Sequence, residues 1–159
     1  MKNTKMSRPK IWALIGAVLV SFGALITPFR LMSSYQTELR QASATGLDTQ
    51  IFQSTYIVSG VLGVLLAVVE LVFIWLAFAK IDKKHRNGWA IFLLVMGILS
   101  VVGAFFTLVG FASPVARATS FDSIGIGLGT IWGILSSLIV GVSFIMAFVV
   151  KHAERKAEI

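Results

Sequence analysis

The chain has 159 residues, of which 57% are hydrophobic and only 13% are charged. Soluble domains carry roughly a quarter of their residues as charged side chains, so this composition excludes a soluble enzyme or soluble binding module and indicates an integral membrane protein. The net charge of +7 does not indicate nucleic-acid binding, because the basic residues bracket apolar runs instead of covering a polar surface. The absence of cysteine excludes disulfides, thiolate metal ligands and a thiol nucleophile.

The first apolar run covers residues 11–29 and follows the basic segment MKNTKMSRPK. A signal peptide is the competing interpretation, since a positively charged segment before an apolar run is typical of it. However, the run is longer than a usual signal-peptide core, and the nearest small-residue cleavage pattern, at 42–44, lies well beyond its end. We therefore expect a retained first membrane span.

The longest connection between apolar runs is residues 30–56, which we expect to form an outer loop. Leu31, Tyr35 and Leu39 recur every four residues, which predicts a short helix with one apolar edge. That edge is suited to rest on the membrane or on the helix bundle, and residues 44–46 predict the end of the helix. A partner-binding loop is the alternative interpretation.

The second apolar run, residues 57–79, contains Glu70 close to its midpoint, and no Lys, Arg or His lies inside any apolar run to pair with it. Residues at three- and four-residue steps share one helix face. On this helix that face combines the carboxylate with small residues that allow a close backbone approach: Gly60, Gly63, Ala67 and Glu70. We expect the face to point into the bundle or toward a partner, shielded from acyl chains.

Residues 80–88 form a short basic loop with Asn87-Gly88 as a turn signal, which predicts an antiparallel hairpin between the second run and the third, residues 89–112. The fourth run covers residues 124–150. Small residues recur along it at strict four-residue intervals: Gly125, Gly129, Gly133, Ser137 and Gly141. This pattern predicts a groove that receives another helix, either of this chain or of another subunit.

Each run is long enough to cross a hydrocarbon core of about 30 Å as a helix, and a helix satisfies its own backbone groups in lipid. The predicted fold is therefore an all-α, four-transmembrane-helix bundle in one membrane domain, residues 1–159. Eleven of the fourteen Lys and Arg residues lie before the first run, in residues 80–88 or after the fourth run. The positive-inside rule then places both termini and the 80–88 loop in the cytoplasm, facing anionic lipid headgroups.

Several polar residues lie near the midpoints of their runs, since a helix rises about 1.5 Å per residue: Ser21, Glu70, Ser100, Ser136 and Ser137. They are predicted to form a polar layer across the bundle. Desolvation there favours the protonated form of an unpaired carboxylate, which can donate a hydrogen bond to a hydroxyl or a carbonyl. Three interpretations stay open: a polar clasp that fixes helix register, a contact to a partner helix, and a proton- or cation-binding site in a transport path.

The sequence contains no phosphate-binding glycine loop, no serine nucleophile with a base and no paired intramembrane carboxylates, and His85 and His152 lie among basic residues. We expect no enzyme activity, cofactor, metal site or nucleic-acid partner. The predicted function is a non-enzymatic accessory, regulatory or interaction subunit in a plasma membrane, bacterial judging by the brevity of the chain, with a membrane-protein partner or a second copy. The alternative is a small oligomeric transporter or channel that uses Glu70 as a proton- or cation-binding carboxylate.

Overall fold

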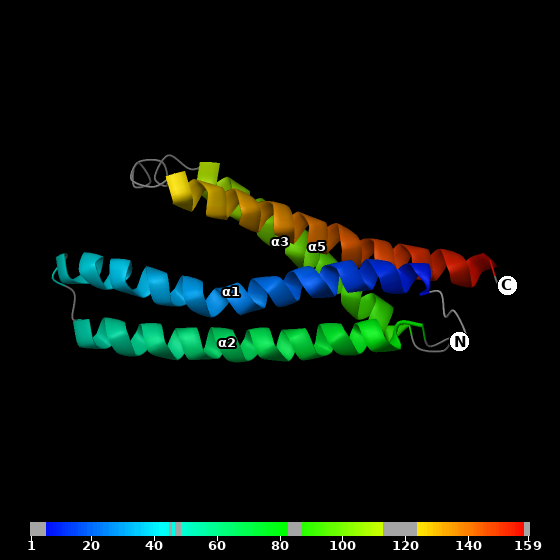
Figure 1. Cartoon of the computed structure of the whole chain (residues 1–159), viewed down its shortest axis with the longest axis horizontal. Helices are drawn as coiled ribbons and strands as arrows, with labels where there is room; N and C mark the ends of the chain where they lie inside the picture. Colours follow the sequence, from blue (N-terminus) through cyan, green and yellow to red (C-terminus); the bar gives the residue numbers. More distant parts are fainter. Residues whose placement is uncertain (1–5, 45, 47–48, 83–86, 113–123, 158–159) are drawn as a thin grey trace. The chain divides into compact units, whose positions relative to one another are not determined.

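The computed structural model describes residues 6–44, 46, 49–82, 87–112 and 124–157, and these residues form long α-helices with no β-strand among them. The helices, labelled as in Figure 1, are α1 (Arg8–Ala44), α2 (Thr49–Lys80), α3 (Gly88–Ala112) and α5 (Ile124–Ala157). The expected all-helical fold is confirmed for this part of the chain.

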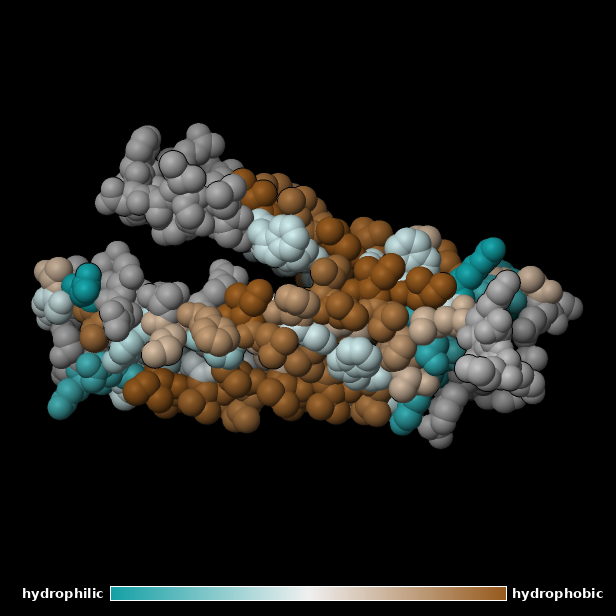
Figure 2. Space-filling view, viewed as in Figure 1, coloured by the Kyte–Doolittle hydropathy of each residue, from teal (hydrophilic) through white to brown (hydrophobic). Residues whose placement is uncertain are grey.

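Each of these helices contains a stretch that is long and apolar enough to cross a membrane. Over the described residues the stretches are Arg8–Phe29, Gln53–Lys80, Gly88–Val109 and Ile131–Ala157. Large hydrophobic side chains are exposed on every helix, with Leu66 and Phe106 each 68% exposed, and Figure 2 shows hydrophobic residues along the helices and hydrophilic residues near their ends. So much exposed apolar surface indicates a multi-pass membrane protein, because soluble proteins rarely expose large apolar patches.

α1 continues past the end of the predicted first span, through Pro28, to Ala44. Pro28 has no N–H, so the helix lacks one backbone hydrogen bond there. In the preceding turn the Thr27 hydroxyl donates to the Gly23 carbonyl oxygen at 2.9 Å. In lipid a helix keeps almost all of its backbone groups satisfied, which favours continuation over a break. Residues 30–56 therefore differ from the expected loop with a short helix: most of them belong to the ends of α1 and α2.

The turn after α1 falls where the sequence indicated a helix end. Gly46 has a φ of 71°, a left-handed conformation that suits glycine after the end of a helix. Its backbone N–H donates to the Ser43 carbonyl oxygen at 3.4 Å. α2 then begins at Thr49.

The chain divides into two compact units. The larger unit comprises Met1–Leu19 and Trp75–Ile159, and the hairpin unit comprises Val20–Ile74. The larger unit thus contains the start of α1, the end of α2 and all of α3 and α5. The hairpin unit contains the remainder of α1 and α2, which run antiparallel.

The larger unit has a core of small and aliphatic side chains around one buried aromatic ring. α3 and α5 approach each other closely at Gly97 and Gly141, since a Cβ atom on Gly97 would lie 2.8 Å from the Gly141 carbonyl oxygen. A Cβ on Gly16 of α1 would overlap the ring of Phe144, whose side chain is fully buried. The other buried residues of this core include Ala13, Ala17, Ala77, Ile81, Ala90, Leu93 and Ala147.

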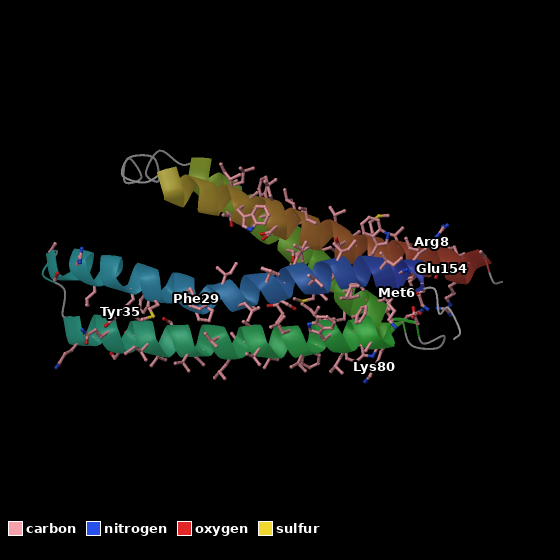
Figure 3. All side chains as sticks on the ribbon, viewed as in Figure 1. Met6, Arg8, Phe29, Tyr35, Lys80 and Glu154 are labelled. Atoms are coloured by element: carbon pink, nitrogen blue, oxygen red, sulfur yellow. The ribbon has the colours of Figure 1, made fainter. Side chains whose placement is uncertain are left out.

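The hairpin unit is held together differently. Tyr35 of α1 and Tyr56 of α2 pack with ring centroids 5.1 Å apart, and Figure 3 shows Tyr35 directed toward α2. Of the predicted apolar edge, Tyr35 thus packs on α2, whereas the side chain of Leu31 lies outside the described residues. Among the described residues of this unit only Ile74, at its boundary, is buried. Most of its apolar surface is therefore exposed.

Candidate functional site

Glu70 lies on α2 inside the hairpin unit, and more than a third of its surface is exposed. Its neighbours on the helix surface include Leu66, which is 68% exposed, and Phe73, which is 44% exposed. We expected this carboxylate to be shielded by the bundle or by a partner; the contacts of its own unit leave it on an exposed apolar face. A carboxyl group presented in this way can donate or accept a hydrogen bond, or bind a cation.

The hairpin unit also contains a cavity that Glu70 does not line. A cavity of about 530 Å³ lies between α1 and α2 within the hairpin unit, and Pro28, Tyr35, Gly60 and Val64 are among its lining residues. Its other lining residues are also mostly apolar, and Glu70 is not one of them. Gly60 thus borders this cavity, whereas Glu70 does not.

Ser21 lies at the same level of the hairpin unit as Glu70. The Tyr35 and Tyr56 rings pack side by side, and Ser21 and Glu70 each lie fourteen residues from that pair, toward the same end of the antiparallel hairpin. Equal counts along two helices correspond to equal rises. The half-exposed Ser21 and the exposed Glu70 therefore share one depth.

The remaining serines of the predicted layer belong to the larger unit. Ser100 lies three residues after Gly97, and Ser137 lies four residues before Gly141, so both lie on the same side of the α3–α5 crossing. The Ser100 hydroxyl donates to the Met96 carbonyl oxygen at 2.9 Å, and the Ser136 hydroxyl donates to the Gly133 carbonyl oxygen at 3.0 Å. The hydroxyl groups of Ser100 and Ser136 therefore donate their hydrogen bonds within their own helices.

The polar residues fall into two groups. Ser21 and Glu70 belong to the hairpin unit, and Ser100, Ser136 and Ser137 belong to the larger unit. Each group has members at similar depth within its own unit. A single polar layer across all four helices stays a prediction.

The small residues singled out in the sequence have contrasting surroundings. A Cβ atom on Gly141 would lie 2.6 Å from Cγ2 of Val101, whereas Cβ atoms on Gly60, Gly63 and Gly133 would meet no described atom within 4 Å. Ala67 is half-buried. Gly125 and Gly129 fall inside the bounds of α5, but their surroundings lie outside the described residues. The small-residue pattern therefore includes residues at the tight α3–α5 crossing, such as Gly141, and residues on open surface, such as Gly63.

A cluster of contacts at the basic end of the larger unit was not found by sequence reasoning. The basic end comprises the start of α1, the end of α2, the start of α3 and the end of α5. There the Ser7 hydroxyl donates to one oxygen of Asp82, and Lys10 Nζ lies 3.6 Å from the other oxygen and 5.3 Å from the ring centroid of Phe78. The sequence feature that points to these contacts is Asp82, a single acidic residue within the basic 80–88 loop. Figure 3 shows Arg8, Lys80 and Glu154 at the same end.

Within the described part of the chain, no three His, Asp or Glu side chains converge in a way that could hold a metal ion. No protein-family model, curated protein or solved structure matches this chain.

Proposed function

We propose that the protein is a non-enzymatic accessory, regulatory or interaction subunit, and that the Glu70 face of α2 contacts a transmembrane helix of a partner or of a second copy. The observation that carries this proposal is the exposure of Glu70 near the middle of a membrane-spanning helix. A charged side chain at the centre of a spanning helix costs about 2.5 to 3.5 kcal/mol. A neighbouring helix with a hydrogen-bonding group would remove much of this cost.

The residues around Glu70 are suited to such a contact. Gly63 and Glu70 are seven residues apart, which places them on the same side of α2. No described atom lies within 4 Å of a Cβ atom on Gly63, so a second backbone has room to approach there. Interhelical hydrogen bonds in membranes contribute about 0.6 to 2 kcal/mol each, so Glu70 would add specificity to a contact made chiefly by packing.

We further propose that the basic end faces the cytoplasm of a bacterial plasma membrane. Lys10 and Lys80 lie at this end, with Lys80 Nζ 5.2 Å from the ring centroid of Trp89. Basic and aromatic residues together are typical of the cytoplasmic interface. Both termini and residues 80–88 would then be cytoplasmic. Labelling of single cysteines introduced at Glu154 and at Ser43, with a membrane-impermeant reagent, would test this topology.

A photo-crosslinking amino acid at position 63 tests the partner contact, and the same probe at Val72 is the matched control. Val72 is exposed but points about 200° away from Glu70 around the helix. In membranes of cells that express the chain, we expect a discrete protein adduct from position 63 and only lipid adducts from position 72. Mass spectrometry of the adduct would distinguish a second copy from another protein. Lipid adducts alone at both positions would contradict the proposal.

A small oligomeric transporter or channel is the second candidate function, favoured by the shared depth of Ser21 and Glu70. A single four-span chain has little room for an aqueous path, so this function would require assembly. Proton and monovalent-cation flux into liposomes would be compared for wild type, Glu70→Gln and the control Glu154→Gln. Transport through Glu70 predicts a loss of flux in Glu70→Gln alone, and unchanged flux would remove Glu70 from the mechanism.

A further inference from the structure

The basic end of the larger unit contains a cavity of about 210 Å³ between the start of α3 and the end of α5. Its polar lining comes from Asn87 before α3 and from Lys151, His152 and Arg155 on α5. Lys151 and Arg155 are four residues apart and therefore project from the same face of the helix. Two cationic side chains thus converge on one small volume.

The ring of His152 is stacked against a second side chain of the cavity. It lies parallel to the Phe148 ring, with an interplanar angle of 6° and a centroid separation of 6.0 Å. This stacking restricts the imidazole orientation beside Lys151 and Arg155. The histidine can therefore contribute a hydrogen-bond donor at a defined place in the lining.

The first turn of α3 adds donors and a partial positive charge. The Ile91 N–H donates to the Asn87 carbonyl oxygen at 3.0 Å, which marks the first helical hydrogen bond at this end. The preceding N–H groups have no carbonyl partner within the helix, and the helix dipole favours an anion beside them. The start of α3 thus contributes a positive electrostatic potential to the cavity, as do Lys151 and Arg155 of α5.

No carboxylate of the described residues lines this cavity. Glu154 is exposed on α5 outside the lining, and Asp82 is paired with Lys10. An anion that entered would therefore meet cationic and donor groups without a competing acid from the lining. This combination of charges selects a negatively charged ligand.

The apolar half of the lining indicates which anion fits. Ala90, Ile91 and Phe148 complete the cavity wall, and Ile91 is 50% exposed on the first turns of a helix whose apolar span starts at Gly88. A free phosphate gains nothing from these side chains. A phospholipid presents a phosphate and an apolar chain at this same membrane depth, and basic pockets between transmembrane helices are typical headgroup sites.

We propose that this cavity binds the phosphate of an anionic phospholipid, with Lys151, Arg155, His152 and Asn87 around the headgroup and the acyl chain along the Ile91 side of α3. The site does not depend on the proposed partner contact at Glu70, which lies in the other unit. It would hold one lipid against α3 and α5 at the basic end.

Native mass spectrometry of the purified full chain tests this site, with phosphatidylglycerol and phosphatidylcholine added in equal amounts. We expect one retained phosphatidylglycerol per chain, and a reduction in its occupancy of at least about tenfold in the Lys151→Gln/Arg155→Gln variant, since each basic residue near the headgroups contributes appreciably to anionic-lipid binding. The matched control is Arg8→Gln/Lys156→Gln, which removes two exposed charges from the same end, outside the lining. It should retain the lipid.

The charge-preserving variant Lys151→Arg/Arg155→Lys should also retain the lipid, which separates loss of charge from loss of folding. Equal loss in the site variant and the control would overturn the proposal, because the preference would then come from diffuse charge. No preference for phosphatidylglycerol in wild type would overturn it as well. Displacement of the lipid by millimolar inorganic phosphate would identify a soluble phosphate as the occupant and reject the lipid.

Discussion

The two units of this protein use the same kinds of residue in opposite ways. In the larger unit, Gly97 and Gly141 approach each other so closely that neither has room for a methyl group. In the hairpin unit, Gly60 and Gly63 have no described atom within 4 Å of an added Cβ. A small-residue pattern therefore identifies a face that permits close approach. It does not tell whether a helix of the same chain occupies that face.

The largest expected effect of a substitution is at the buried aromatic ring of the larger unit. Phe144→Ala should lower the free energy of unfolding by about 3 kcal/mol, because it leaves a cavity among close-packed neighbours. Phe29→Ala is the matched control in the hairpin unit, where the ring is 76% exposed. Reversible unfolding in bicelles with a denaturing detergent would measure both. A comparable loss at Phe29 would break the contrast between the units.

A smaller loss is expected where α3 and α5 cross. Gly97→Ala places a methyl group 2.8 Å from the Gly141 carbonyl oxygen and 3.0 Å from Cγ1 of Ile145. Overpacking of this kind costs about 1 to 3 kcal/mol, since the helices must separate slightly. Gly60→Ala, at a position where an added Cβ meets no described atom within 4 Å, should be neutral or slightly stabilising. Unfolding of the two variants under identical conditions sharpens the contrast, and equal losses would contradict it.

The smallest expected effect concerns the ion pair at the basic end. Asp82→Asn removes the charge that faces Lys10 but keeps an oxygen that accepts from the Ser7 hydroxyl. The Lys10 and Asp82 side chains are 27% and 42% exposed, so we expect a loss of less than about 1 kcal/mol. The loss should shrink further in high salt. Glu154→Gln is the control, and a salt-independent loss in Asp82→Asn would show that packing, not charge, holds this end together.

Prediction from the sequence succeeded where the physical cause is local. The four apolar runs became helices because a spanning segment must satisfy its own backbone hydrogen bonds. The helix end predicted at residues 44–46 is also found, with Gly46 in the left-handed conformation. The 30–56 segment differed from the predicted outer loop, because the end of the apolar run at residue 29 does not end the helix: α1 continues to Ala44 through residues that tolerate a helical conformation. Tyr35 then found its contact on α2.

The sequence by itself determined the helical class, the number of spans and the crowding of basic residues at one end, since composition and hydropathy act residue by residue along the chain. Only the tertiary structure decided that Gly16 lies against Phe144, that Asp82 joins Ser7 and Lys10, and that Lys151 and Arg155 share a cavity with the start of α3. These contacts join residues far apart in the chain. They depend on which faces of the helices meet, and that choice is made by packing between helices, which no single helix encodes.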